Sequence, residues 1–131
     1  MAHLLVIENW YSGIGHRFLR RIHELGHRFT FVSRDLAPNW RRLPPDGPHP
    51  LTAADHILTA DTNDLPGLLD FLERQHALLR FDGVATACDY YLGHVAQVAQ
   101  RLGLPGPGAE AEETARLKHK MRLALEKAGL P

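Results

Sequence analysis

The sequence predicts an α/β domain with three layers, in which an open parallel sheet of about four strands carries helices on both faces and a further helical segment follows. Short apolar runs without polar interruption, such as residues 4–7, are typical of strands buried on both faces of a parallel sheet. Apolar residues at helical spacing follow these runs. Strand and helix therefore alternate along the chain, as they do in linked βαβ units.

The first unit contains a glycine turn. Gly13 and Gly15 follow the apolar run at residues 4–7, and the next helix is expected to end at Gly26. The apolar stripe of this helix consists of Ile14, Phe18, Leu19, Ile22 and Leu25. Residues 28–33 are the second predicted strand, reached by a right-handed crossover. Such a unit places the positive end of the helix at the carboxyl edge of the sheet, where anionic or polar ligands bind.

Prolines interrupt the alternation of strand and helix after the second strand. They are Pro38, Pro44, Pro45, Pro48 and Pro50. Because proline lacks an amide hydrogen and disrupts both helices and strand pairing, we expect an irregular connection here, without helix or strand. A surface loop held by Trp40 is the expected form, and a mobile ligand-facing flap with Arg41 and Arg42 is the alternative.

Two more strand–helix units complete the sheet. Residues 54–59 are expected to form the third strand. A polar side chain within residues 62–64 is expected to cap the helix that follows this strand. Residues 84–87 predict the fourth strand. Asp89 is the expected cap of the next helix, and Gly103 ends that helix.

The first strand is expected to lie in the centre, which gives the order 3-2-1-4 of a Rossmann-like sheet. In such sheets, ligands approach where the strand order reverses, here at the ends of strands one and four. Gly13 and Gly15 follow strand one, and Asp89 and Tyr90 follow strand four. These four residues are therefore the predicted substrate-binding residues.

Composition limits the classes of function. A chain of 131 residues is long enough for one hydrophobic core. Its 15 Lys and Arg balance its 15 Asp and Glu, so no overall field favours nucleic acid or an anionic membrane. Cys88 is the only cysteine, which excludes an internal disulfide. The apolar run at the start is too short for a signal sequence or a membrane span, so we expect a cytoplasmic protein.

Two motifs suggest other functions. His23, Glu24 and His27 match the HExxH spacing of zinc hydrolases, but Gly26 stands at the expected helix end, so the two histidines would not share one helical face. Gly13 and Gly15 supply two glycines of a dinucleotide fingerprint, whereas Phe18 occupies the third position. An NAD(P)-binding oxidoreductase domain remains an alternative, and a non-catalytic binding module is another.

The second half of the chain carries a longer signature. It runs from CDYYLGHVAQVAQRLGLPGPG at residues 88–108, through a helix with Thr114, to KHKMR at residues 118–122 and LALEKAGLP at residues 123–131. This run resembles the segment that precedes the nucleotide-binding lid in ATP-grasp ligases. It is similar in particular to the biotin-carboxylase-like and amino-acid-ligase-like carboxylate–amine ligases, and the opening strand, glycine turn and helix resemble the start of the same family.

The resemblance implies a pre-ATP-grasp domain at residues 1–108 and a helical connector at residues 109–131 that leads to an ATP-grasp domain absent from this chain. The intact enzyme is expected to use ATP and Mg²⁺ to activate a small-molecule carboxylate as an acyl phosphate for attack by an amine. The 131 residues alone are expected to be a truncated, inactive piece, without catalytic or metal-binding residues of their own. A homodimer is a further expectation.

Lys120 matches the family lysine that reaches the nucleotide phosphates, and the adjacent Lys118 is the alternative. The family often has aspartate directly before this lysine, whereas this chain has His119. The resemblance therefore adds one nucleotide-binding residue to the four predicted at the substrate.

Overall fold

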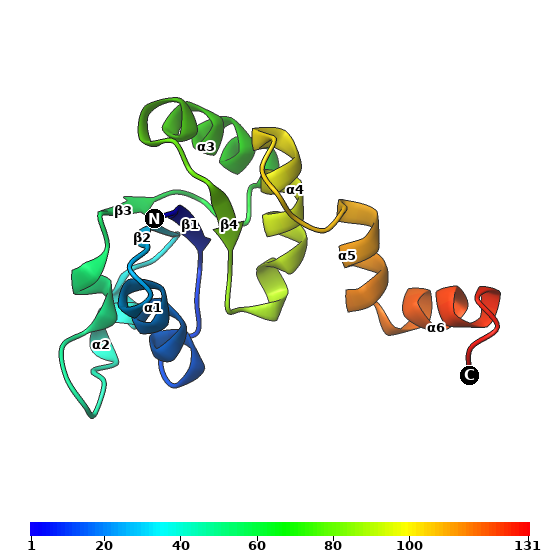
Figure 1. The fold of residues 1–131 in the computed structure, drawn as a ribbon, viewed down its shortest axis with the longest axis horizontal. Helices are drawn as coiled ribbons and strands as arrows, with labels where there is room; N and C mark the ends of the chain where they lie inside the picture. Colours follow the sequence, from blue (N-terminus) through cyan, green and yellow to red (C-terminus); the bar gives the residue numbers. More distant parts are fainter.

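The sheet has four parallel strands in the order β3-β2-β1-β4 (Figure 1). The computed structural model describes residues 1–131. The strands are β1 (His3–Ile7), β2 (Arg28–Ser33), β3 (His56–Thr59) and β4 (Gly83–Ala85). In the central strand β1, Leu5 pairs with Thr30 of β2 and with Val84 of β4. The predicted order and the parallel directions are confirmed.

Helices cover both faces of this sheet. They are α1 (Ile14–Glu24), α2 (Ala37–Arg41), α3 (Leu65–Leu79) and α4 (Leu92–Leu102), with the short 3₁₀ helices η1 (Pro50–Ala53) and η2 (Asp89–Tyr91). Leu5 and Ile7 of β1 pack in a core with α3 and α4, whereas Val6 packs in a second core with α1 and η1. Alternate residues of a strand point to opposite faces, so one apolar run serves both cores.

The helix ends follow from local signals in the sequence. The Asp64 side chain accepts the Gly67 amide at 3.2 Å and caps α3, as the cluster at residues 62–64 predicts. Gly26 after α1 and Gly103 after α4 take left-handed backbone angles, with φ of 79° and 67°. Glycine adopts this conformation without the steric cost of a Cβ, so both predicted helix ends are confirmed.

Two predictions about helices are wrong. The proline-rich connection contains α2 and η1, because Pro38 and Pro50 stand in the first turn of each, where an amide hydrogen has no helical partner to lose. Asp89 does not cap α4. The chain makes the 3₁₀ turn η2 first, so Asp89 lies three residues before α4 begins and forms no capping hydrogen bond.

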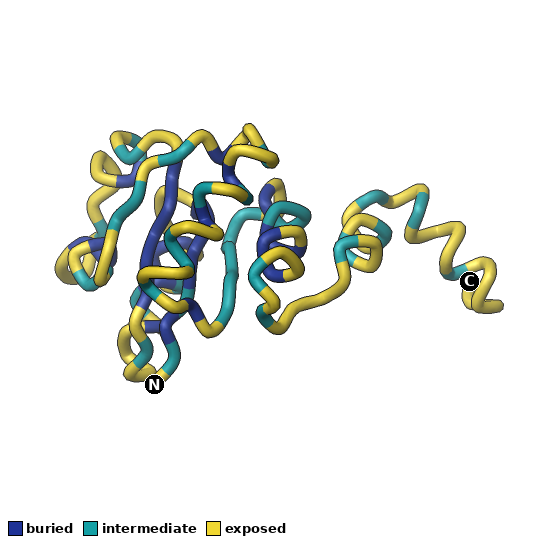
Figure 2. Tube along the Cα trace, turned by 90° about the horizontal axis from the view of Figure 1, so that it is seen from above, coloured by how far each residue is buried: buried dark blue, intermediate teal, exposed yellow.

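The last two helices, α5 (Ala109–Arg116) and α6 (Lys118–Lys127), form an arm that extends away from the sheet beyond α4 (Figure 1). Neither helix contains a buried residue, and Figure 2 shows this part of the chain as mostly exposed. Both lie within the helical connector expected at residues 109–131. None of the helices combines the length and the apolar character that a membrane crossing requires.

Glu8 joins the ends of the strands. It directly follows β1, takes a left-handed backbone with φ of 51°, and is 5% exposed. Its carboxylate accepts hydrogen bonds from Ser33 Oγ at 2.9 Å, the Arg34 amide at 2.8 Å and Thr62 Oγ at 2.7 Å. Its backbone carbonyl accepts a hydrogen bond from Thr86 Oγ at 3.3 Å. The carboxyl ends of β1, β2, β3 and β4 are thus tied to one buried side chain and its backbone.

Replacing Glu8 with alanine is expected to lower the free energy of unfolding by about 2–4 kcal/mol, because the three donors to its carboxylate lose their acceptor together. Glu8→Gln should lose less. Its amide oxygen still accepts from Arg34 and Thr62, and the Ser33 hydroxyl can rotate to accept from its amide nitrogen. The cost of the left-handed backbone at position 8 is the same in the parent and in both variants, so it cancels when their free energies of unfolding are compared. Chemical denaturation measures both changes, and an alanine variant as stable as the parent would contradict this role.

Candidate functional site

The turn between β1 and α1 requires both of its glycines. Gly13 has φ of 58° and ψ of −113°, a combination that residues with a Cβ strongly avoid. At Gly15, a Cβ would lie 2.0 Å from the Trp10 carbonyl oxygen. The backbone of the turn therefore lies directly against the first turn of α1, which is possible only without a side chain at Gly15.

Asn9 fastens this turn to α1. The side chain is 5% exposed, and its Nδ2 donates a hydrogen bond of 2.8 Å to the Gly15 carbonyl. The Gly15 amide in turn donates to the Ser12 carbonyl at 3.2 Å. No side chain caps the N-terminus of α1, and no acidic residue stands in its first turn. This end of the helix therefore keeps its positive partial charge, which favours an anionic group.

The residues after β4 lie at the same carboxyl edge of the sheet as the glycine turn after β1. Asp89 and Tyr90 belong to η2, and both are exposed. The ring of Tyr90 contacts the buried Tyr91 edge to face, with centroids 4.9 Å apart. The Tyr91 hydroxyl donates to Asn63 Oδ1 at 3.2 Å. Burial raises the pKa of the Tyr91 phenol, and the charge of Glu8 acts in the same direction. Tyr91 therefore anchors η2, while Tyr90 and Asp89 face solvent.

The structure brings four of the five predicted site residues to one edge. Gly13 and Gly15 follow β1, and Asp89 and Tyr90 follow β4, the neighbour of β1 in the sheet. No hydrogen bond joins the glycine turn to η2. Lys120 lies elsewhere, on α6 of the arm (Figure 1), where its Nζ is 2.9 Å from Glu113 Oε1 of α5. This hydrogen bond to Lys120 lowers the pKa of Glu113.

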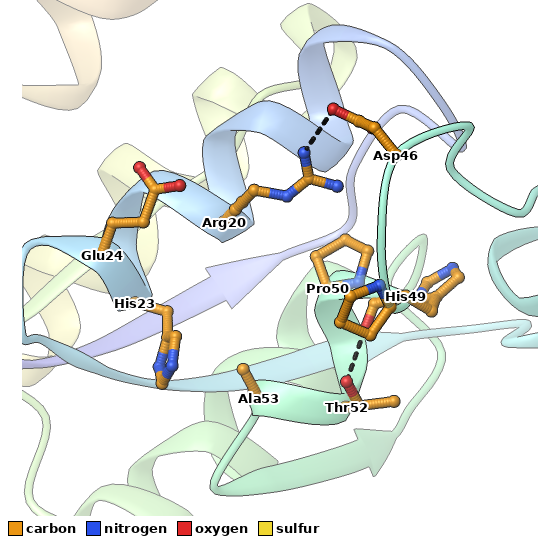
Figure 3. Close-up of a pocket in the computed structure, with 9 residues that line it drawn as sticks. Arg20, His23, Glu24, Asp46, His49, Pro50, Thr52 and Ala53 are labelled. Carbon is orange, nitrogen blue, oxygen red and sulfur yellow. Dashed lines mark hydrogen bonds and ion pairs between the residues drawn. The ribbon is translucent and has the colours of Figure 1, made fainter.

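The HExxH residues do not lie on one helix. α1 ends at Glu24, and His27 lies beyond the left-handed Gly26, as the sequence predicts. The Ala2 amide donates to His27 Nδ1 at 3.1 Å. His23, by contrast, extends from α1 on the side of Ala53 (Figure 3). The pair therefore lacks the common helical face that a zinc site of this type needs.

A cavity of about 580 Å³ lies between α1 and the chain around η1 (Figure 3). Arg20 of α1 forms an ion pair across it with Asp46, at 3.1 Å. His49 is already occupied by the backbone: its Nδ1 accepts the Leu51 amide at 3.1 Å, and its Nε2 donates to the Asn39 carbonyl at 2.8 Å. These hydrogen bonds join η1 to α2, and they leave His49 no free nitrogen for a ligand.

Sequence reasoning missed the residues that organise the edge. Glu8 and Asn9 come directly after the apolar run of β1, Ser33 ends β2, and Thr86 follows β4. Polar side chains directly after each buried strand were the available signal, because the carboxyl ends of parallel strands meet at one edge. The sequence-based prediction instead selected Gly13 and Gly15 of the following turn, and it overlooked Glu8 and Asn9.

Comparison with known proteins agrees with this architecture. The segment at residues 20–106, more than half of the chain, matches the family model of the ATP-grasp N-terminal domain. A stretch of 49 residues is 43% identical to alanine–anticapsin ligase of Bacillus subtilis (strain 168), and it covers 37% of this chain and 10% of that protein.

Two solved structures share the fold. L-amino acid ligase from Bacillus licheniformis superposes with a TM-score of 0.80 and 24% identity, over 100% of this chain and 31% of that one. N5-carboxyaminoimidazole synthetase from Staphylococcus aureus, complexed with ADP, gives a TM-score of 0.63 and 12% identity, over 98% of this chain and 30% of that one. This chain thus spans about a third of the length of either ligase. The sheet order agrees with the family match, and the match to more than half of the chain shows that the chain belongs to the ATP-grasp N-terminal domain family.

Proposed function

We propose that this chain is the substrate-side domain of an ATP-dependent ligase that joins a carboxylate to an amine. The match of residues 20–106 to the ATP-grasp N-terminal domain carries the proposal. The similar proteins named above, among them alanine–anticapsin ligase and L-amino acid ligase, support it. The same match favours the ligase over the nicotinamide alternative, in which Phe18 would stand where a third glycine is needed.

In the proposed reaction, an oxygen of the substrate carboxylate attacks the γ-phosphorus of ATP, and ADP leaves with the electrons of the broken P–O bond. The product is an acyl phosphate. The amine nitrogen then attacks the acyl carbon and loses one proton, and inorganic phosphate leaves. The intact protein thus forms a C–N bond at the expense of one ATP.

The carboxyl edge is the proposed place of the small-molecule substrate. The uncapped first turn of α1 favours an anionic group, and Gly13, with nothing within 4 Å of its Cβ position, would let a ligand come close to the backbone. Gly15, which lies against the Trp10 carbonyl, would contribute by shaping the turn that the ligand meets. Asp89 and Tyr90 would face the same ligand from β4, the carboxylate as a hydrogen-bond acceptor and the phenol as donor or acceptor.

The arm is the proposed connection to the nucleotide. Residues 109–131 would lead into an ATP-grasp domain, with Lys120 at the ATP phosphates and Lys118 as the alternative. In the structure the Lys120 ammonium lies 2.9 Å from the Glu113 carboxylate of α5. Mg²⁺ would neutralise phosphate charge. The magnesium ligands would belong to the ATP-grasp domain, as the family resemblance implies.

Three further expectations belong to this proposal. Residues 1–131 alone should not turn over, since the proposed nucleotide site is only partly contained in them. The cytoplasm is the proposed location, because ATP is available there. A homodimer stays a prediction.

Hydroxylamine tests the reaction class, because it captures an acyl phosphate as a hydroxamate. The intact protein, incubated with ATP, Mg²⁺, hydroxylamine and a panel of carboxylic and amino acids, should form hydroxamate and release phosphate in equal amounts. The hydroxamate is measured as its coloured ferric complex. Phosphate release without hydroxamate for every acid in the panel would contradict an acyl phosphate mechanism.

Lys120→Ala in the intact protein should raise the apparent KM for ATP about tenfold or more, because a phosphate loses a charged hydrogen-bond donor. Lys127→Ala on the same helix is the matched control, and Lys118→Ala separates the two candidates. Steady-state phosphate release at varied ATP measures the effect. An unchanged KM in the Lys120 variant would remove this residue from the nucleotide site.

A further inference from the structure

Large apolar side chains gather in solvent beside the carboxyl edge of the sheet. Trp10 is 53% exposed, Tyr11 40% and Ile14 69%. Trp10 and Tyr11 belong to the tightly held connection between β1 and α1, and Ile14 is the first residue of α1. They line a cavity of about 320 Å³ together with Ser12 and Arg42. Neither apolar core includes these three side chains, so packing within the domain does not explain them.

The backbone beneath this cavity is fixed. Gly15 lies against the Trp10 carbonyl, the Asn9 side chain holds the Gly15 carbonyl, and the Gly15 amide binds Ser12. The aromatic residues therefore stand on a turn whose conformation is set before a ligand arrives. A surface ordered in advance loses less conformational freedom when a ligand binds.

The charge around the cavity has one sign. Arg42, from the chain after α2, is the only charged residue that lines it, and its guanidinium has no ion-pair or hydrogen-bond partner in the structure. No carboxylate lines the cavity. The uncapped N-terminus of α1, whose first residue Ile14 belongs to the lining, adds positive partial charge. An anionic group is thus complementary to this wall, and an apolar body is complementary to the aromatic wall.

The size of the cavity limits the ligand. A volume of about 320 Å³ lies at the low end of the range of roughly 300–1,000 Å³ for small-molecule sites. It suits an acid of amino-acid size with one ring or branched chain.

We propose that this cavity selects the carboxylate substrate of the ligase: Trp10, Tyr11 and Ile14 contact an aromatic or branched apolar side chain, and Arg42 pairs with the substrate carboxylate. The assignment rests on the proposed ligase function. It makes Trp10 and Arg42 substrate-binding residues in addition to those that the sequence predicts.

Binding without turnover separates the cavity from the reaction. Calorimetry on the intact protein uses two probes with an apolar body and a carboxylate, 3-phenylpropionate and L-phenylalanine, and the uncharged 3-phenylpropanol. At least one of the acids should bind. Trp10→Ala should weaken the acid and the alcohol about tenfold, through lost aromatic contact. Arg42→Ala should weaken only the acid, about tenfold or more, since a charged hydrogen-bond donor is lost.

Matched controls remove equivalent groups outside the cavity. Leu78→Ala deletes a side chain of α3 that is 77% exposed, and Arg41→Ala deletes the neighbouring exposed cation. Both should leave the affinities within about twofold, as expected for surface positions. In the hydroxylamine assay, Trp10→Ala should raise the KM for the aromatic acid and leave that for acetate unchanged.

The outcomes distinguish the two proposals. Binding that the Trp10 and Arg42 variants weaken as expected, without hydroxamate from any acid, supports the cavity and overturns the ligase reaction. Hydroxamate formation that neither variant affects supports the reaction and overturns the cavity. Failure of both acids to bind, or a change confined to the KM for the amine, also overturns the assignment of the cavity to the carboxylate substrate.

Discussion

The carboxylate of Glu8 fixes the place where the strands of this domain end. A charged group that is 5% exposed is stable only when its oxygens are hydrogen-bonded. The donors come from the end of β2 and from the chain after β3, and the Glu8 carbonyl receives a further donor from the chain after β4. The segments that follow β2, β3 and β4 are therefore each hydrogen-bonded to this one residue.

The exposure of the side chains changes sharply between Asn9 and Trp10. Glu8 and Asn9 are buried and hydrogen-bonded, whereas Trp10 and Tyr11 are exposed. The close contact between Gly15 and the Trp10 carbonyl holds the backbone at this point, whereas the side chains of Trp10 and Tyr11 are exposed to solvent. The proposed binding surface therefore stands on a backbone that the buried hydrogen bonds of Glu8 and Asn9 hold in place.

Periodicity in the sequence was sufficient for the strands, the long helices and the sheet order, because burial on two faces and helical spacing are local patterns. The two wrong predictions, an irregular proline-rich connection and a cap at Asp89, came from residue preferences that depend on the position within a helix. Proline is unfavourable inside a helix, yet Pro38 and Pro50 occupy first turns. Aspartate is a good cap, yet the burial of Tyr91 and its hydrogen bond to Asn63 hold the chain after β4 in a 3₁₀ turn before α4 begins.

The sequence by itself determined the alternation of strands and helices and the glycine turn, since hydrophobic period and backbone sterics act within a few residues. The alternation in turn indicated a parallel sheet of Rossmann-like strand order. Only the tertiary structure decided which polar residues form the centre of the carboxyl edge. Ser33 and Thr62 lie 25 and 54 residues from Glu8 along the chain. Hydrogen bonds over such separations depend on the register of the paired strands and on the path of the chain after each strand, which no local pattern specifies.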